Sequence, residues 1–355
     1  MKKLIYTLAA LLMTCLSLEA ETITASFNLA TYNLRNANAT DSINGNPWMP
    51  RCRMIASMMK FHDFDIFGTQ EGLRAQLNTL KAELPGYEYI GVGRSDGKEA
   101  GEHSAIFYNT DIFYCEESGN FWLSETPDVP GSKGWDAAWE RICTWGRFRH
   151  LDTGIEFYYF NLHTDHQGKE ARVNGVNLVL DKIREIAGNS TAFLSGDFNV
   201  TQHNICYRNI CNSGILEDAH EKSDFVFEPN GTYNDWKPNG MTNGRIDHIF
   251  VSDDVKVNRF GVLTETFRSV DDKNVNMETD KKYLDKVVKC NIQLPSDHFP
   301  VLIGAQISAE STGVSVIRGT ERPVDNRIFN LNGMEVKNPT APGIYIRNGR
   351  KFIVH

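Results

Sequence analysis

The sequence predicts an α/β fold in which two sheets pack against each other and helices cover their outer faces. Three observations support this prediction. Strand-like and helix-like segments alternate from Thr24 to about Ile307. Two stretches carry apolar residues at helical spacing. Polar residues that can perform chemistry stand at the ends of apolar strand-like runs, where they would meet at one rim of the sheets.

The strand-like segments are short runs rich in β-branched and aromatic residues. We expect them at residues 26–33, 65–69, 104–108, 155–162, 192–194, 246–251 and 301–307. We expect helices at residues 51–61, along a stripe formed by Leu73, Leu77, Leu80 and Leu84, and along a stripe formed by Val173, Val176, Leu180, Ile183 and Ile186. Residues 265–294 are charged and poorly periodic, which predicts a long surface excursion.

The first twenty residues have the layout of a secretory signal peptide. Lys2 and Lys3 give a positive start, an apolar run follows, and Ala20 offers a small residue at a cleavage point. The apolar run is too short to span a bilayer. We therefore expect export to the periplasm, the medium or the outer surface, and Cys15 leaves a lipoprotein open. No later stretch of the sequence has the length and apolarity of a transmembrane helix.

The sequence changes character after Ser308. Segments 327–336 and 343–354 resemble short strands broken by Asn-Gly turns at Asn332-Gly333 and Asn348-Gly349. We therefore divide the chain into a signal peptide at 1–20, a main domain at 21–308, and a linker with a small C-terminal β module at 309–355. We expect the protein to be a monomer.

Charge and cysteine content narrow the classes of function. The formal net charge of −8 argues against strong non-specific DNA binding through broad basic patches, but an enzyme that cleaves nucleic acid needs only a local positive site. Six cysteines lie outside the signal, and the spacing of Cys206 and Cys211 favours a disulfide between them. Buried free thiols are the alternative. No second Cys or His pair stands at the spacing of a zinc site.

The chemistry-bearing residues follow or precede the apolar runs in six places. Phosphoryl transfer needs charge stabilisation at phosphorus and a positioned water, which hard metal ions, carboxylates and imidazoles supply. The six places are Asn33, Gln70-Glu71, Asn161-Leu162-His163, Gly196-Asp197-Phe198-Asn199, Asp247-His248 and Ser296-Asp297-His298. Taken singly, each is more often a turn, a helix cap or a surface pair. The complete ordered set is far more specific.

This ordered set resembles the endonuclease/exonuclease/phosphatase superfamily, in a secreted bacterial branch, over residues 24–307. The resemblance implies a four-layer α/β/β/α sandwich of two mixed sheets. It also implies hydrolysis of a phosphate ester by in-line attack of an activated water, with Mg²⁺ as the cofactor and Mn²⁺ or Ca²⁺ as alternatives. Arg35 departs from the apurinic endonucleases of the family, which usually place an acid there, and this weakens an analogy with DNA repair.

The resemblance also implies a role for each matching residue. The metal would lie at Glu71, close to Asn33 and Asp297. Catalysis would rest on the following groups: Asp197 to orient or deprotonate the water, Asn199 to hold the water or a phosphate oxygen, His163 and His298 to bracket the phosphate, and Asp247 to fix the tautomer of His298. Deoxyribonuclease-like members place an acid at the position of Glu102, which would pair with His163.

The sequence does not identify the substrate. Four of the six tryptophans lie between Trp122 and Trp145. Within this segment, Trp135 and Trp139 could form a wall for a base, a sugar or a lipid headgroup, and Arg141 could bind a phosphate; packing in the core or a loop is the alternative. A phosphodiesterase or phosphatase, an extracellular nuclease, a sphingomyelinase-like phospholipase and a non-catalytic surface-binding protein all remain open, and the complete motif set speaks against the last.

Overall fold

The computed structural model describes residues 22–227, 230–270, 281, 287–310, 328–330, 336, 343–347 and 350–354. The predicted signal peptide with Cys15, residues 311–327 of the predicted linker and module, and both predicted Asn-Gly turns lie outside the described residues. Residues Glu21–Glu310 form one unit of the chain, and the segment from Ser311 to His355 belongs to another. No helix in the described part of the chain has the length and apolarity needed to cross a membrane.

Two sheets form the centre of the larger unit. The seven-stranded sheet has the order β12 (Val226–Phe227), β14 (Val255–Val262), β17 (Val301–Glu310), β1 (Thr22–Asn33), β2 (Ile66–Gln70), β6 (Ile106–Asn109) and β4 (Tyr87–Ile90). The six-stranded sheet has the order β11 (Glu217–Asp218), β13 (Asp247–Val251), β10 (Ala192–Asp197), β9 (Glu156–His163), β8 (Ile142–His150) and β7 (Phe113–Trp122). Both are mixed: β1 runs parallel to β2 and β9 parallel to β10, while their other neighbours run antiparallel.

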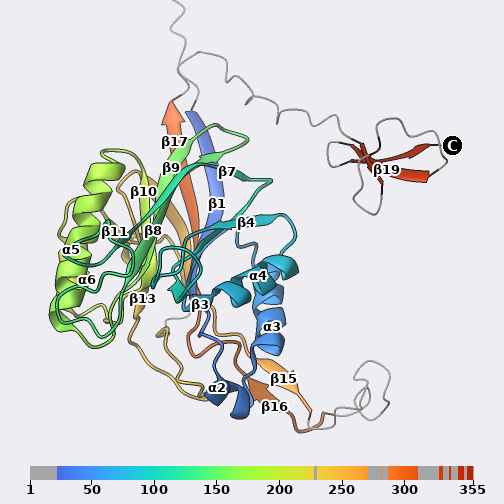
Figure 1. Ribbon diagram of the computed structural model, residues 1–355, viewed down its shortest axis with the longest axis horizontal. Helices are drawn as coiled ribbons and strands as arrows, with labels where there is room; N and C mark the ends of the chain where they lie inside the picture. Colours follow the sequence, from blue (N-terminus) through green and yellow to red (C-terminus); the bar gives the residue numbers. More distant parts are fainter. Residues whose placement is uncertain are drawn as a thin grey trace, which may run out of the picture. The chain divides into compact units, whose positions relative to one another are not determined.

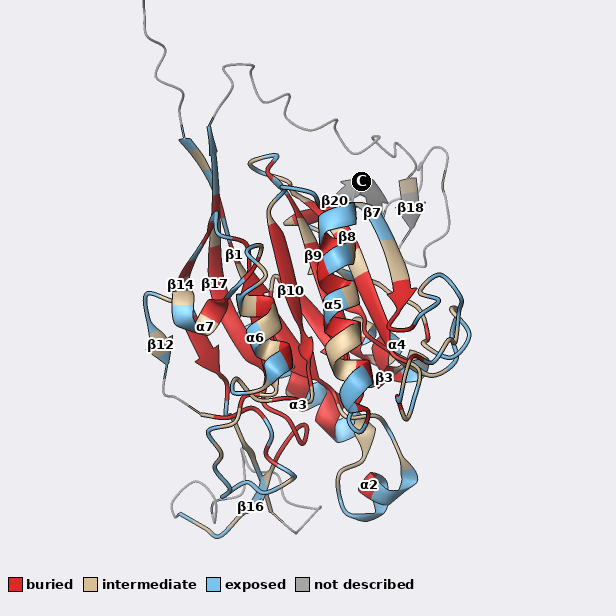
Figure 2. Cartoon of the chain, turned by 90° about the vertical axis from the view of Figure 1, so that its left-hand side faces the viewer, coloured by how far each residue is buried: buried red, intermediate tan, exposed pale blue. Residues whose placement is uncertain are grey.

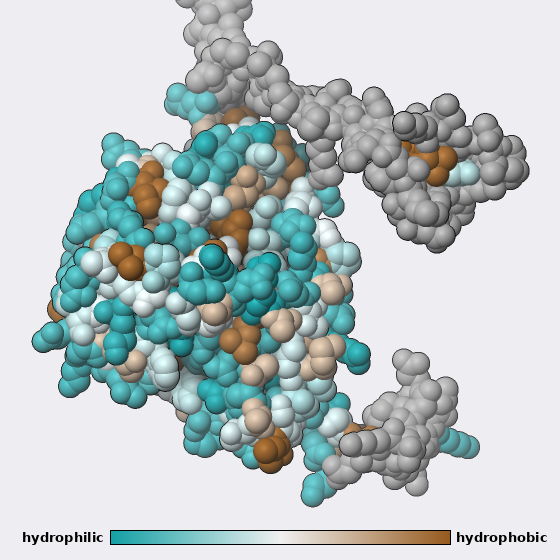
Figure 3. Space-filling model, viewed as in Figure 1, coloured by the Kyte–Doolittle hydropathy of each residue, from teal (hydrophilic) through white to brown (hydrophobic). Residues whose placement is uncertain are grey.

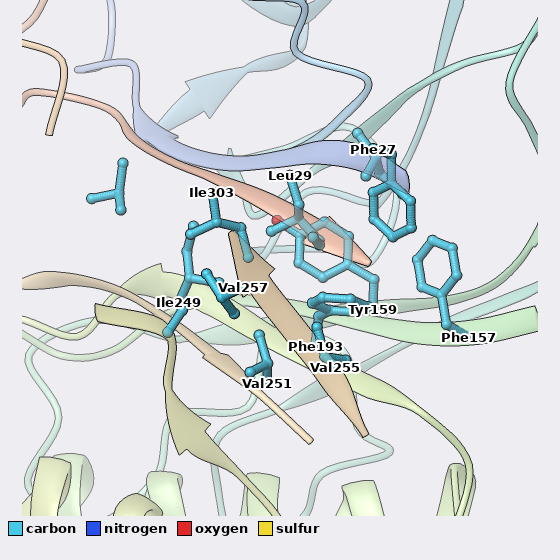
Figure 4. Packing of buried hydrophobic residues seen from close by; sticks show 14 of the residues in the cluster. Phe27, Leu29, Phe157, Tyr159, Phe193, Ile249, Val251, Val255, Val257 and Ile303 are labelled. Carbon is cyan, nitrogen blue, oxygen red and sulfur yellow. The ribbon is translucent and has the colours of Figure 1, made fainter. Parts of the chain in front are cut away.

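The main hydrophobic core lies between the two sheets (Figure 4). Phe27 on β1 stacks against Phe157 on β9 with ring centroids 5.0 Å apart, and Phe193 on β10 packs edge-on against Phe157. Alternate residues of each strand face this interface, because successive side chains of a strand point to opposite sides of the sheet. The inward-facing aromatic rings therefore join the sheets into one body.

Helices cover the outer faces of both sheets (Figures 1 and 2). α5 (Lys169–Ile186) and α6 (Ile205–Cys211) pack on the six-stranded sheet through a second apolar cluster. α3 (Trp48–Phe61) and α4 (Arg74–Glu83) pack on the seven-stranded sheet through a third. The buried residues of α5 follow the predicted apolar stripe, which confirms that helix. The predicted α/β fold of two packed mixed sheets with outer helices is thus confirmed.

A buried network of polar side chains connects the two sheets near the strand ends that carry the predicted catalytic residues. The Asn161 Nδ2 group donates to the carbonyl oxygens of Thr69 and Ala105, both at 3.0 Å, while Gln70 Nε2 donates to Asn161 Oδ1 at 2.7 Å. All of these groups are fully buried, so each hydrogen bond satisfies an atom that would otherwise lack a partner. Gly68 leaves the space for this network.

Replacing Gly68 by alanine is expected to destabilise the fold. A Cβ at this position would lie 2.3 Å from Asn161 Oδ1, so the network must shift. We expect a loss of about 1–3 kcal/mol in the free energy of unfolding, measured by urea denaturation. Gly175→Ala on α5 is the control: its Cβ would meet Leu123 at 3.5 Å, an ordinary contact, and alanine favours a helix by about 0.5–1 kcal/mol. Equal stability of the Gly68→Ala protein and the wild type would contradict this role.

Several elements differ from the sequence prediction. β7 and β8, which contain Trp122 and Trp145, were not predicted. Within the predicted surface excursion, β15 (Phe267–Ser269) pairs with β16 (Asn291–Gln293). The remaining elements of the main unit are α2 (Ala39–Ile43), β3 (Gly72–Leu73), β5 (Glu102–His103) and α7 (Ala219–Lys222). The C-terminal segment contains the antiparallel strands β18 (Ile328–Asn330), β19 (Gly343–Arg347) and β20 (Arg350–Val354).

The cysteines of the described residues are free thiols, including Cys206 and Cys211. The disulfide favoured by their spacing is therefore absent from the structure, and the alternative of unpaired thiols holds. Burial raises the pKa of Cys206, which lies against α5 in the second apolar cluster. A thiol in such a setting behaves as a small apolar side chain.

Candidate active site

The predicted strand-end residues meet at one edge of the sandwich. Because β1 and β2 are parallel, as are β9 and β10, their C-terminal ends share an edge. β13 runs antiparallel to β10 and therefore begins there. A cavity of about 640 Å³ opens at this edge and is lined by Arg35, Asn36, Glu71, Arg94, Glu102, Trp139, Arg141, His163, His166, Asp197, Asn199, Tyr233, Ile246, Asp297 and His298.

His298 is held by the buried carboxylate of Asp247, the first residue of β13. Its Nδ1–H donates to Asp247 Oδ2 at 2.8 Å, and its Nε2 lies 3.8 Å from Asp197 Oδ2. Burial alone would lower the pKa of His298, but Asp247 and Asp197 raise it to about 10. The imidazole is therefore positively charged at neutral pH, with Nε2–H facing the cavity side occupied by Asp197.

Asp197 lies at the centre of the site and is almost fully buried. Its Oδ1 accepts from the backbone N–H of Asn199 at 2.9 Å, and its Oδ2 accepts from Asn33 Nδ2 at 3.0 Å. Burial, followed by the nearby Asp247 carboxylate, raises the pKa of Asp197 to about 7. A carboxylate with its pKa near neutrality is well matched to accept a proton from water.

The pKa of His163 is shifted in the opposite direction from that of His298. Its Nε2 accepts from Asn199 Nδ2 at 3.0 Å and lies 3.5 Å from Asp197 Oδ2. Burial, then the positive charges of Arg141 and Arg94, hold the pKa of His163 well below its usual value. The two histidines therefore flank Asp197 in different states, one neutral and one positively charged.

The residues expected at the metal offer oxygen donors. Glu71 and Asp297 both line the cavity, and the charge of Glu71 contributes to the raised pKa of Asp297, although burial is the main cause. Asn33 Nδ2 donates to Glu71 Oε1 at 3.1 Å, and its own Oδ1 accepts from the backbone N–H of Arg35 at 2.9 Å. Two carboxylates that line the same cavity suit a hard cation such as Mg²⁺. Asn33 positions Glu71 and Asp197 rather than presenting a free oxygen.

Asp197, Asp247 and His298 also place one ligand atom each within 4.8 Å of one another. However, His298 Nδ1 is hydrogen-bonded to Asp247. His298 and Asp247 therefore form an ion pair beside Asp197, and this nitrogen is not free to bind a metal. The carboxylates of Glu71 and Asp297 remain the better match for a metal.

Three residues that line the cavity adopt left-handed backbone conformations without being glycine. Arg35 has φ of 54°, Glu71 of 62° and Asn199 of 50°. Such conformations cost energy in non-glycine residues and persist where surrounding contacts hold them. Here the Asp297 and Asp41 carboxylates bind Arg35, while Asn199 follows Asp197 in a tight turn. The turns aim these side chains into the cavity.

Glu102 lies in the cavity but is paired differently from the sequence expectation. Its Oε1 accepts from Asn36 Nδ2 at 2.8 Å, and its Oε2 contacts Arg94 Nη1 at 2.5 Å. The expected pairing with His163 does not occur among the described residues; His163 Nε2 is instead bound by Asn199. Arg94 lies in the loop between β4 and β5 and forms an ion pair with the Glu102 carboxylate.

Arg141 is buried at the cavity wall beside a second acid. Its Nε lies 3.3 Å from Asp165 Oδ1, and its Nη2 donates to His166 Nδ1 at 3.1 Å. Asp165 also accepts from the backbone N–H groups of Ala138 and Trp139. One buried carboxylate thus fixes both the guanidinium and the loop that carries Trp139.

The four clustered tryptophans have separate positions. Trp139 lines the cavity and is 55% exposed. Trp135 is not among the cavity-lining residues, so the structure does not support its expected place in a substrate wall. Trp122 is buried and donates to the carbonyl oxygen of Arg94, while Trp145 packs against Phe160. Packing therefore accounts for Trp122 and Trp145, as the alternative reading proposed.

Sequence reasoning missed six cavity residues. All six line the cavity but were not assigned to the site: Arg35, Asn36, Arg94, His166, Tyr233 and Ile246. Asn36 and His166 stand three residues after Asn33 and His163, so the loop that follows each predicted motif was the available signal. Tyr233 packs edge-on against His298 with centroids 5.1 Å apart, from a loop that has no motif of its own.

Comparisons with known proteins agree with this arrangement. The family model described as "Endonuclease/Exonuclease/phosphatase family" matches residues 30–298. A solved family protein from Bacteroides thetaiotaomicron is 51% identical, with a TM-score of 0.74, over 80% of this chain and 99% of that one. A mannosyl-6-phosphatase of Bacteroides thetaiotaomicron VPI-5482 is 52% identical, with a TM-score of 0.72, over 79% of this chain and 99% of that one.

Two further relatives are less similar. A family protein from Bacteroides vulgatus is 35% identical, with a TM-score of 0.68, over 79% of this chain and 98% of that one. An uncharacterised protein of Acanthamoeba polyphaga mimivirus is 28% identical over 161 residues, a match that covers 43% of this chain and only 59% of that protein's length. The family model and the solved relatives, each matching most of the chain, establish that the protein belongs to the endonuclease/exonuclease/phosphatase family.

Proposed function

We propose that this protein is a Mg²⁺-dependent phosphoester hydrolase that acts on a small phosphate monoester, with sugar phosphates as the first class to test. The observation that carries the proposal is Asp197, buried between a neutral His163 and a charged His298 at the edge of a cavity. This arrangement supports attack of water on a phosphoryl group. The 52% identity to a mannosyl-6-phosphatase supports the proposal that the substrate is a phosphate monoester of a sugar.

In the proposed reaction, a water oxygen attacks phosphorus while the bond from phosphorus to the ester oxygen breaks. Asp197 orients the water and accepts its proton, and Asn199 fixes Asp197 through its backbone N–H. His298, kept charged and oriented by Asp247, donates from Nε2 to a phosphoryl oxygen as negative charge develops there. The leaving oxygen takes up a proton from solvent, and Asp197 returns the proton of the attacking water to solvent, so the products are an alcohol and inorganic phosphate.

Glu71 and Asp297 would hold the metal, which when bound supplies positive charge to the phosphoryl oxygens. Asn33 joins this side of the site to the water-binding side, because its amide nitrogen donates to both Glu71 and Asp197. His163 contributes a neutral ring whose Nε2 anchors Asn199. Glu71, Asp297 and His163 line the cavity, while the fully buried Asn33 orients two of its carboxylates.

A panel of substrates tests the proposal. Purified protein with Mg²⁺ is offered a hexose 6-phosphate, inositol phosphates, bis-p-nitrophenyl phosphate, plasmid DNA, RNA and sphingomyelin, and product release is measured for each. We expect phosphate release from the monoesters, lost with EDTA and restored by Mg²⁺. Cleavage of DNA or RNA with no release from monoesters would make the protein a nuclease instead. Absence of cleavage of every substrate would contradict hydrolase function.

We also propose that the protein is exported. The proposal rests on the charged start, apolar run and small residue of the first twenty positions. Fractionation of cells that produce the full chain, with mass spectrometry of the mature N-terminus, tests it. A mature protein that begins after Ala20 or at Cys15 supports export, and an uncleaved chain in the cytoplasm contradicts it.

A further inference from the structure

We propose that the part of the cavity formed by Asn36, Arg94, Glu102, Arg141 and Trp139 is a recognition subsite for an uncharged, hydroxyl-rich alcohol, in which Glu102 is the specificity-determining hydrogen-bond acceptor. This inference rests on the proposed phosphoester hydrolysis. It assigns the residues that recognise the alcohol part of the phosphate ester. We call this group the polyol subsite. Its members line the same cavity as Asp197 and His298.

Glu102 is oriented from two sides but keeps accepting capacity. Asn36 donates to one carboxylate oxygen and Arg94 to the other, so the carboxylate plane is fixed. A carboxylate has about four lone-pair positions, and these two contacts leave the remainder for a ligand. The side chains of Glu102 and Arg94 are 16% and 12% exposed, and both line the cavity. A fixed acceptor beside a guanidinium fits neighbouring hydroxyl groups of a sugar.

The charges of the cavity arginines argue against a second phosphate. Arg94 is paired with Glu102, and Arg141 with Asp165 at 3.3 Å. Arg35 is paired with Asp41 at 2.7 Å and with Asp297 at 3.3 Å. Binding to a nucleic-acid backbone needs Lys or Arg side chains free to neutralise several phosphates. Among the described residues that line the cavity, every arginine has a carboxylate partner and no lysine is present. Arg141 Nη1 and Arg94 Nε are buried without a hydrogen-bond partner in the described part of the chain, so single donors rather than whole guanidinium groups remain for a ligand.

Trp139 supplies an apolar surface at the same place. It is 55% exposed, and its backbone N–H donates to Asp165 Oδ1 at 3.3 Å, the oxygen that also contacts Arg141 Nε. An exposed indole held by its backbone offers a flat surface to the C–H face of a sugar ring. On the face shown in Figure 3, brown apolar residues are scattered among hydrophilic ones.

The test compares two substrates in matched variants. We measure kcat and KM for a hexose 6-phosphate and for p-nitrophenyl phosphate, which lacks hydroxyls, in the wild type, Glu102→Gln and Glu99→Gln. Glu99 is 73% exposed and does not line the cavity, so it controls for the substitution itself. In Glu102→Gln we expect the ratio of kcat/KM for the sugar ester to that for p-nitrophenyl phosphate to fall about tenfold, through KM, because a hydrogen bond to a charged group is lost.

Several outcomes would overturn the polyol subsite. An unchanged ratio in Glu102→Gln contradicts it, and an equal loss of kcat on both substrates assigns Glu102 to the chemistry instead. A hexose bisphosphate hydrolysed with higher kcat/KM than the monophosphate contradicts the charge argument. If the wild type hydrolyses no monoester at all, it is the proposed function that fails.

A binding measurement separates the two failures. Calorimetry with the hexose 6-phosphate, and with inorganic phosphate for comparison, is carried out on Asp197→Ala and on Asp197→Ala with Glu102→Gln. We expect the second substitution to weaken sugar phosphate binding about tenfold relative to phosphate binding. Equal relative affinities in the two proteins would overturn the subsite whether or not the wild type is active.

Discussion

Replacing His298 by alanine is expected to reduce kcat about 10³-fold or more, with a smaller change in KM. The side chain donates to the phosphoryl group in the proposed reaction, and removing one such donor typically costs about 10²–10³-fold. His298 is 5% exposed and carries a positive charge between two carboxylates, so its loss also leaves Asp197 and Asp247 with uncompensated charges. Steady-state release of phosphate from a hexose 6-phosphate measures the effect.

A matched histidine separates this effect from general damage. His203 is exposed in the loop that follows β10 and does not line the cavity, so His203→Ala should retain the activity of the wild type. Asp197→Ala should lose activity to a similar extent as His298→Ala, because general base catalysis contributes about 10²–10⁴-fold. Thermal unfolding of each variant establishes that it is folded. Turnover like that of the wild type in His298→Ala or Asp197→Ala would contradict the mechanism.

The second large effect is expected at Glu71. Changing Glu71 to Gln removes one of the two carboxylates offered to the metal and keeps the shape of the side chain. We expect the Mg²⁺ concentration needed for half-maximal activity to rise at least about tenfold, and kcat to fall about 10²-fold at saturating Mg²⁺, because the phosphoryl oxygens receive less compensating charge. Activity as a function of Mg²⁺ concentration gives both values.

Calorimetric titration of Mg²⁺ without substrate provides a readout that does not depend on activity. The wild type should bind Mg²⁺ measurably, Glu71→Gln should bind it more weakly, and Glu99→Gln should match the wild type. Asn33 Nδ2 can still donate to the glutamine oxygen, so the local hydrogen bond of Asn33 survives in the variant. Unaltered Mg²⁺ binding in Glu71→Gln would place the metal elsewhere in the cavity.

The strand-end residues could be predicted because their positions follow from local sequence. Glu71, Asp197 and His298 each lie next to a short apolar run, and runs of this kind form strands whose ends meet at one edge. Asn161 shows a limit of this reasoning. It was noted as part of the motif with His163, but in the structure it bridges the two sheets and does not line the cavity. A motif residue can serve the scaffold that positions its neighbour.

The partners of Glu102 could not be predicted from the sequence. Arg94 and Asn36 come from loops whose conformations depend on tertiary contacts, including the left-handed turn at Arg35. β7 and β8 escaped prediction because tryptophans and charged residues there obscure the alternation expected of a strand. The spacing of Cys206 and Cys211 suggested a disulfide, but both residues lie on α6 or at its end, and the structure keeps both as thiols.

Hydrolysis of a hexose 6-phosphate in ¹⁸O-labelled water tests the central claim most directly. Mass spectrometry of both products reports which bond breaks. If Asp197 directs water to phosphorus, the inorganic phosphate carries one ¹⁸O atom from solvent and the C6 oxygen of the released sugar carries none. Label at the C6 oxygen would mean that the carbon–oxygen bond breaks, and no release of phosphate would mean that this cavity does not hydrolyse the ester. Either result would contradict the function derived from this site.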